Sequence, residues 1–271
     1  MEESIEESIY NFDELKMYFG EDYWVTDKIC IKVPTIGDIL EFGDSKFYSM
    51  LNLFCANPTS LRLQLWQMGV DWNEISDYEL FANIIVKRFT PKDTHLLFGN
   101  LDFSCFEFVH DNKKDCNLLV NVEKDEEGNI VDFNYEDAIV IDELVYKRMI
   151  KYLCTMFDLK FKVEHAKNKA TKRAIIEEDE MNLKISEQKR EKQEYSKSFL
   201  LPLISAWVNH PGFKYKTNEL KDIGIYQFMD SVKRLQTYEN ATALLKGMYS
   251  GFVDAKKINQ KELNWLKDLN E

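Results

Sequence analysis

The segment DKICIKVPTIGDILEFG, residues 27–43, passes from a strand pattern to a helix pattern and sets the fold class of the chain. Its ICIKV run, residues 29–33, alternates apolar residues with polar or small ones, which predicts a half-buried strand. Thr35 and Asp38 have capping-box spacing, in which each side chain accepts a hydrogen bond from the other residue's backbone N–H. We therefore expect a strand followed at once by a short helix that Gly43 closes.

Helical spacing of apolar residues continues downstream of this segment. Asp44 or Ser45 can cap a helix that reaches the Asn-Pro break at residues 57–58, and a helix with two apolar sides follows from Thr59. A second capping box at residues 76–79 starts another helix. The sequence thus predicts a group of short helices after the first strand.

A strand pattern returns between residues 102 and 133. The apolar runs 118–122 and 130–133 flank DEEGN, residues 125–129, where Gly and Asn accept the positive φ that a tight connection needs. A small antiparallel sheet with a hairpin turn at DEEGN is therefore predicted, and Asp142 can cap the helix that follows. Helices combined with a separate antiparallel sheet indicate an α+β fold.

Residues 165–198 contain no Gly or Pro and are rich in Lys, Glu, Arg and Asp. Good helix formers without breakers predict a helix, whereas the apolar positions are too sparse to favour a coiled coil. We expect a charged, solvent-exposed helical connector that joins two independently folded units with few contacts between them.

The C-terminal part returns to apolar helical patterns. A helix from Phe199 should break at His-Pro-Gly, residues 210–212, and two further helices are predicted at residues 225–235 and 240–249. Asn259 and Glu262 again have capping-box spacing. These elements predict a C-terminal helical bundle.

The domain prediction follows from these patterns. It places an α+β domain at residues 1–164, the charged helical connector at residues 165–198 and a C-terminal helical domain at residues 199–271.

Composition points to protein partners. The chain has 271 residues, of which 45% are hydrophobic, so it has enough apolar surface for a sizeable core. Its net charge of -12 repels nucleic acid and anionic membranes at long range. No signal peptide or apolar run long enough to span a bilayer is recognisable, and five cysteines without a CxxC pair indicate reduced, buried thiols. We expect a cytoplasmic protein.

No catalytic, cofactor or metal residues are expected. Cys105 and His110 have the odd separation that places them on opposite faces of a strand, and His110 with Cys116 lacks two further metal ligands. Phosphate-binding glycine loops are missing, and DEEGN is too short for a calcium loop. The basic run at residues 167–173 has no interleaved aromatic residues, which favours a solvated helix face over RNA binding.

Four tryptophans are the candidate partner contacts: Trp66, Trp72, Trp207 and Trp265. Large aromatic side chains often dominate the binding energy of an interface. The alternative for each is a place in the core, because all four lie within helical apolar patterns.

Two stretches resemble a known family. Residues 33–43 with the run LQLWQMGVDWNEISDYELF at residues 63–81, and IYQFMDSVKR at residues 225–234, resemble a protein encoded among the tail genes of long-tailed phages and prophages of Gram-positive bacteria. The resemblance implies a tail assembly chaperone that binds the tape-measure protein and helps to recruit tail-tube subunits in the host bacterial cytoplasm. A structural tail component and a host-directed effector are the alternatives.

Overall fold

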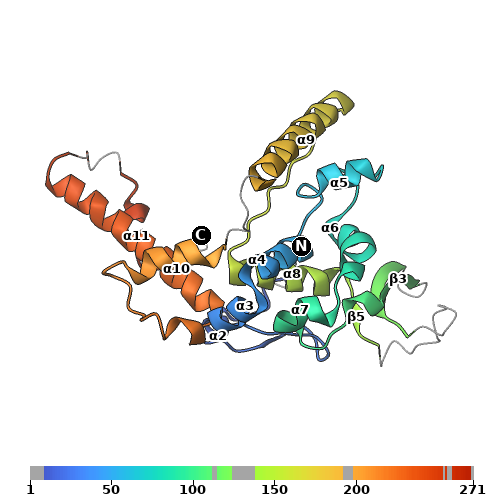
Figure 1. Ribbon diagram of the computed structural model, residues 1–271, viewed down its shortest axis with the longest axis horizontal. Coiled ribbons are helices and arrows are strands. Elements are labelled where there is room, and N and C mark those ends of the chain that lie inside the picture. Colours follow the sequence, from blue (N-terminus) through green and yellow to red (C-terminus); the bar gives the residue numbers. More distant parts are fainter. Residues whose placement is uncertain are drawn as a thin grey trace.

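The computed structural model describes residues 9–111, 115–123, 138–191, 198–252, 254 and 258–269, and it confirms the α+β class. Figure 1 shows an elongated molecule with the β3–β4 hairpin at one end and helix α11 at the other. The elements before the larger sheet are α2 Glu14–Tyr18, β1 Tyr23–Trp24, β2 Cys30–Ile31, α3 Ile36–Phe42, α4 Asp44–Phe54, α5 Arg62–Gln67, α6 Asp77–Leu80, the π-helical turn η1 Phe81–Ile85, the 3-10 turn η2 Val86–Arg88 and α7 Pro91–Phe98. The remaining elements are η3 Phe103–Cys105, β3 Phe106–Asp111, β4 Cys116–Asn121, β5 Val140–Ile141, α8 Glu143–Phe157, α9 Lys169–Glu191, α10 Leu200–Val208, η4 Leu220–Asp222, α11 Ile225–Tyr249 and η6 Gln260–Leu263.

Strand β2, Cys30–Ile31, is shorter than the strand predicted from the alternating run at residues 29–33. Strand β2 pairs with β1 only at Tyr23–Ile31 and Trp24–Cys30. The backbone N–H of Lys32 leaves the ladder and donates to the carbonyl of Leu97 at the end of α7, 2.8 Å away. A neighbouring helix therefore takes the hydrogen bond that would have extended the strand.

Three of the predicted helix caps are confirmed, whereas neither Asp44 nor Ser45 caps α4. Thr35 Oγ1 accepts from the backbone N–H of Asp38 at 3.1 Å, and Asp38 Oδ2 accepts from that of Thr35 at 2.8 Å. Ser76 and Glu79 form the same arrangement at the start of α6. Asp142 caps α8 by accepting from Val145 N–H at 2.8 Å.

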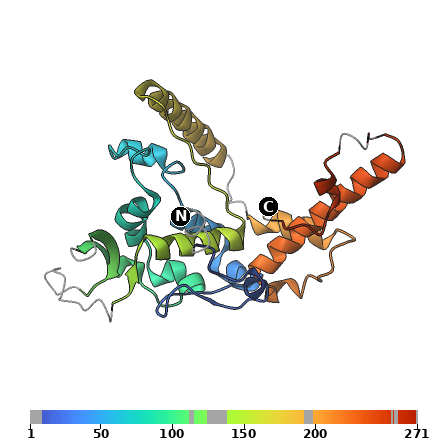
Figure 2. The same ribbon diagram turned by 180° about the vertical axis from the view of Figure 1, so that it is seen from behind.

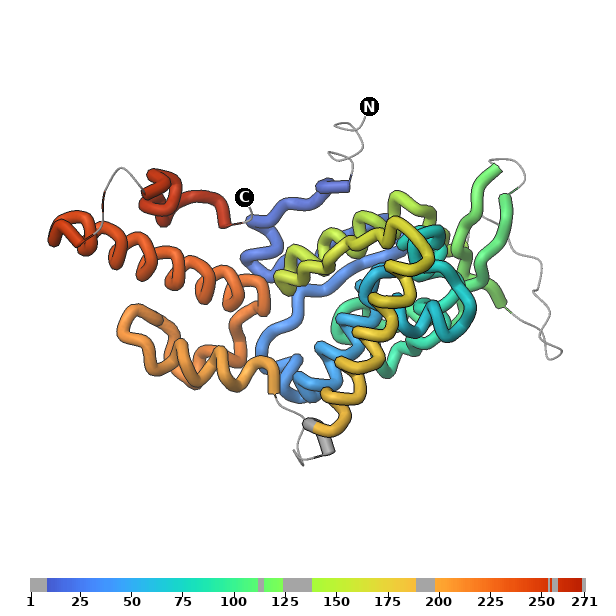
Figure 3. The backbone as a smooth tube through the Cα atoms, turned by 90° about the horizontal axis from the view of Figure 1, so that it is seen from above, coloured from blue at the N-terminus to red at the C-terminus, as the bar shows by residue number. Residues whose placement is uncertain are grey.

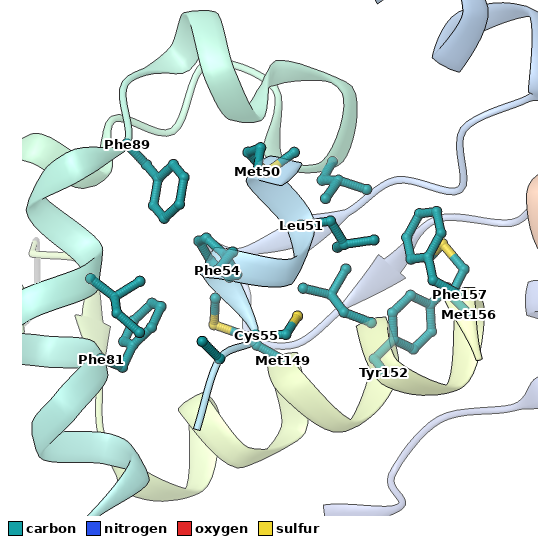
Figure 4. Close-up of a cluster of buried hydrophobic side chains, with 14 of the residues drawn as sticks. Met50, Leu51, Phe54, Cys55, Phe81, Phe89, Met149, Tyr152, Met156 and Phe157 are labelled. Carbon is teal, nitrogen blue, oxygen red and sulfur yellow. The ribbon is translucent and has the colours of Figure 1, made fainter. Parts of the chain in front are cut away.

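A core of aromatic and sulfur-containing side chains lies between α4 and α8 (Figure 4). Phe54 of α4 is fully buried and meets four phenylalanine rings with centroids 5.1–5.4 Å away: Phe81, Phe89, Phe98 and Phe103. Removing a buried Phe side chain of this kind costs about 3–5 kcal/mol.

The predicted antiparallel sheet is confirmed, with strand order β3–β4–β5. The predicted turn at residues 125–129 and the run 130–133 lie outside the described residues. The buried Tyr78 hydroxyl of α6 joins the sheet to the helices, because it donates to the Ile141 carbonyl at 2.6 Å and accepts from Leu119 N–H at 3.0 Å.

The C-terminal part does not stand apart from the body, so the expectation of few contacts was wrong. Thr35 and Gly224 form an antiparallel bridge, and Ile225 N–H donates to the Pro34 carbonyl at 2.9 Å. The side chains of Ile225 and Phe228 are fully buried in the same core as α4. Apolar periodicity identified the buried faces, but it could not show that they pack on a distant part of the chain. The domain boundaries themselves stay a prediction.

Two predictions about the C-terminal helices also need correction. Helix α11 runs unbroken through Ile225–Tyr249, because residues 236–239 contain no breaker, and Gly251 with φ 76° follows its end. Asn259 caps only a 3-10 turn, accepting from Lys261 N–H at 3.0 Å. Figure 3 shows α11 extending away from the body.

No described helix combines the length and the apolar character needed to cross a membrane.

Candidate partner-binding surfaces

The four candidate tryptophans lie in three separate places. Trp66 on α5 and Trp72 after this helix pack edge to face, with ring centroids 6.1 Å apart. Trp207 is half-buried on α10, and Trp265 is exposed near the C-terminus. Only 2% of Trp72 is exposed, which leaves it almost no surface for a partner. Partner binding by Trp66, Trp207 and Trp265 stays a prediction.

An extended strap, residues 162–166, is held by side chains in place of a neighbouring strand. Asn57 Nδ2 donates to the Lys162 carbonyl at 2.8 Å. Asn73 Nδ2 donates to the Ala166 carbonyl at 2.8 Å, and Asn73 Oδ1 accepts from Ala166 N–H at 3.3 Å. The Asn73 amide thus donates and accepts as the backbone of a paired strand would, and with Asn57 it fixes the path of the strap to α9.

Ion pairs then clamp α9 to the region around α5, which Figures 1 and 2 show beside one end of that helix. The Arg62 guanidinium donates to both carboxylate oxygens of Asp179, at 2.5 and 2.7 Å, and to Glu164 at 2.7 Å. The hydrogen bonds to Asp179 contribute most to a raised pKa of Arg62, and the bond to Glu164 adds to it. Lys172 pairs with Asp71. Hydrogen bonds from Lys172 and from the backbone of Asn73 lower the pKa of the Asp71 carboxyl.

The helical prediction for the connector agrees with α9, but its packing was underestimated. Ile176 is buried, and Arg62 and Asp71 reach α9 from outside the connector. Most of the described side chains of α9 are exposed, as predicted, but Lys172, Ile176 and Asp179 are not. Residues 192–197 lie outside the described part of the chain.

Two polar cavities border the clamp. The larger, of about 540 Å³, lies between the start of α5, the strap and α9. The second, of about 410 Å³, combines Trp66 with Lys167, Lys169 and Lys172. Asp71 and Glu74 line the second cavity as well, so its charges are mixed. Trp66 therefore lies near the basic run in space, although it is distant in sequence. The carboxylates of Asp71 and Glu74 beside it weaken the attraction of the basic run for phosphate.

An apolar groove of about 200 Å³ lies on the other side of α5, and we call it the α5 groove. Leu61, Leu65 and Met68 come from α5 and its ends, whereas Leu53 and Ile84 come from α4 and η1. Half of Met68 is exposed at this groove. Thioether and aliphatic side chains adapt to many apolar shapes, so such a groove suits an apolar side chain of a protein partner.

The free end of α11 carries a second apolar region. Arg234 Nη1 donates to the carbonyls of Trp265 at 2.9 Å and Lys267 at 2.6 Å, which holds the C-terminal segment against the helix. Beyond this contact Tyr249 and Phe252 are almost fully exposed, at 87% and 91%.

The groups tested for chemistry have ordinary structural surroundings. His110 Nδ1 lies 3.0 Å from Asn117 Oδ1 across the β3–β4 ladder, and Cys105 precedes β3 in η3. Within the described residues no group of three or more His, Cys, Asp and Glu side chains could hold a metal ion.

The five cysteines are free, but only Cys55 is buried, so the expectation of buried thiols was too broad. Cys105 is exposed, and the other three are half-buried. The thiol of Cys55, directly after α4, lies beside that of Cys154 on α8, a proximity that the sequence did not indicate. Burial raises the pKa of Cys55, which suits a packing role and not that of a nucleophile.

Two further residues were missed. Trp24 is the most exposed tryptophan, at 62%, although no sequence pattern predicted a role for it. Trp24 faces outward because it follows the inward-facing Tyr23 in β1, and neighbours in a strand point to opposite faces. Asp44 caps α10 instead of its own helix: its Oδ2 accepts from Ser198 Oγ at 2.5 Å and from Leu200 N–H at 3.1 Å.

The C-terminal part of the chain is similar to a phage-derived family. More particularly, residues 190–270 match the family model described as the YomV second domain, which derives from a Bacillus prophage. This match indicates a phage origin, in agreement with that part of the resemblance noted above. No curated protein and no solved structure matches the chain.

Proposed function

We propose that this protein is a non-catalytic phage tail assembly factor, a chaperone that binds the tape-measure protein, tail-tube subunits or both in the host bacterial cytoplasm. The α5 groove is the observation that carries the proposal. It offers an apolar cavity with the partly exposed Met68 at the surface of a phage-related chain. A helix-rich client with an apolar stripe could insert one side chain there, as in other helix-in-groove complexes.

Co-expression with the tape-measure protein tests this role. The wild-type chain should raise the soluble fraction of the client and co-purify with it. Met68→Glu should weaken both effects, because a charged side chain at the mouth of the groove must lose hydration when an apolar group of the client enters. Met181→Glu on the exposed surface of α9 is the matched control and should behave like wild type.

Two results would contradict the chaperone role. One is a client that stays insoluble and unbound in the presence of the wild-type chain. The other is the presence of this protein at fixed copy number in purified particles, because an assembly factor leaves before the tail is complete.

A further inference from the structure

Helix α2 and strand β1 each have one side packed on the core and one side facing solvent. The solvent-facing side does not need apolar residues for folding. Met17 of α2 is buried in the main core, and Tyr23 of β1 stacks on Tyr152 with centroids 4.6 Å apart. Leu15 and Phe19 flank Met17 at two positions on either side, which places them on the opposite face of the helix. The inner sides of α2 and β1 therefore already pack on the core, and polar residues on their outer sides would be compatible with the fold.

Large apolar side chains stand there instead. Leu15 is 64% exposed, Phe19 71% and Trp24 62%. Single exposed apolar residues are common, but three of them within ten consecutive residues form an unusual surface for a soluble domain. We call these three residues the α2–β1 surface.

The turn between the two elements is well defined. Gly20 has φ 76°, Gly20 N–H donates to the Met17 carbonyl at 3.0 Å, and Glu21 N–H donates to the Lys16 carbonyl at 2.9 Å. This pattern is the Schellman ending of a helix. The turn fixes where the chain leaves α2, so the α2–β1 surface is presented by an ordered backbone.

Carboxylates flank these apolar groups along the sequence. Asp13, Glu21, Asp22 and Asp27 are all exposed within residues 13–28, in which Lys16 and Lys28 are the basic residues. The imbalance extends along the chain, because residues 1–150 contain 30 Asp and Glu against 13 Lys and Arg. A partner with basic groups around an apolar stripe would complement this surface, and an acidic partner would be repelled.

We propose that the α2–β1 surface is a docking site for a basic amphipathic helix of a protein partner. Leu15, Phe19 and Trp24 contact the apolar stripe, and the surrounding carboxylates pair with its Lys and Arg side chains. The site is separate from the α5 groove, and the inference does not depend on which client the groove takes.

A labelled synthetic peptide provides the probe. It contains roughly 18 leucines and lysines at amphipathic helical spacing, and its counterpart carries Glu at every Lys position. Fluorescence anisotropy at physiological salt should show binding of the basic peptide to the full-length chain and no binding of the acidic one. Phe19→Ser and Trp24→Ser should each weaken binding by about tenfold, as expected of aromatic anchors. Tyr249→Ser and Phe252→Ser, at the other exposed aromatic region, should leave it unchanged.

A charge-matched pair separates docking from general attraction. Glu21→Gln with Asp22→Asn should weaken binding and reduce its salt dependence, whereas Glu177→Gln with Glu178→Gln on α9 changes the net charge equally and should have no effect. Circular dichroism checks that each variant is folded. If Phe19→Ser does not fold, the binding of the Trp24→Ser variant alone tests the proposal.

Three results would overturn the proposal: equal binding of the acidic peptide, equal weakening by the α9 pair, or peptide binding that appears only after residues 2–8 are deleted. The last would mean that the chain's own N-terminus occupies the surface.

Discussion

Gly37 lies directly against the backbone of Lys221, and a Cβ on residue 37 would stand 2.8 Å from the Lys221 carbonyl oxygen. This contact brings together the α3 segment and the turn before α11, which lie in or directly before the two stretches that carry the family resemblance. The glycine allows the bridge between Thr35 and Gly224 to form beside it.

Gly37→Ala should lower the free energy of unfolding by about 1–3 kcal/mol, because the methyl group forces two backbone segments apart. Chemical denaturation measures the change. Gly224→Ala is the control: its added Cβ meets only Val33 Cγ1 at 3.7 Å, so a loss below about 0.5 kcal/mol is expected. Equal losses for both variants would show that the close approach at Gly37 does not matter.

Asp44→Ala should cost about 1 kcal/mol of stability through loss of the α10 cap. The effect should depend on pH. Burial of Asp44 favours the neutral acid, but the hydrogen bonds from Ser198, Leu200 and Ser45 outweigh it and lower the pKa overall.

A carboxyl whose folded-state pKa lies below its unfolded value stabilises the protein above the unfolded value of about 3.9 and loses this contribution as the pH falls through the folded value. Thermal unfolding of wild type and Asp44→Ala should therefore differ at neutral pH and converge in acid below pH ~3.9. Glu41→Ala, at an exposed position of α3, should show no such convergence. A constant difference between wild type and Asp44→Ala across this range would exclude the ionised cap.

Arg62→Met should release α9 from α5. The substitution removes three hydrogen bonds and leaves Asp179 and Glu164 without their cation. Limited trypsin digestion should then cut the lysines and arginines of residues 167–184 several-fold faster than in wild type, because cleavage follows local opening. Arg88→Met, on the exposed side of η2, is the matched control. Unchanged cleavage in Arg62→Met would show that the ion pairs do not hold the helix.

Tyr78→Phe should destabilise the fold by about 1–3 kcal/mol, because it leaves Leu119 N–H and the Ile141 carbonyl without their buried partner. Tyr238→Phe, at an exposed position of α11, should change stability by less than about 0.5 kcal/mol. Hydrogen exchange at Leu119 gives the local measurement, and unaltered protection there would argue against the role of the hydroxyl.

Local features were the part of the fold that the sequence could predict. The caps at Thr35, Ser76 and Asp142 involve residues three positions apart, so these caps can be recognised directly from the sequence. The α10 cap escaped prediction because Asp44 is 156 positions from Leu200. Non-local hydrogen bonds of this kind leave no periodic trace in a sequence.

The candidate sites show the same limit. Trp66 lines the cavity beside the basic run and not the α5 groove, which combines α5 with Ile84 and Leu53 from other elements. Trp72 has the same local apolar context as Trp66 and is buried, since only tertiary packing distinguishes the two. Trp24 was overlooked because a strand of two residues is too short for alternation to be recognised.

The joint between residues 33–37 and 221–225 also affects how this gene can vary. The family match begins at residue 190, yet the residues downstream of it complete a core built mainly from residues upstream. Recombination at that boundary would separate Gly37 from the carbonyl it must accommodate. Among related chains, the residue at position 37 and the backbone course at positions 221–224 should therefore be inherited as a pair, even though more than half of the chain lies between them.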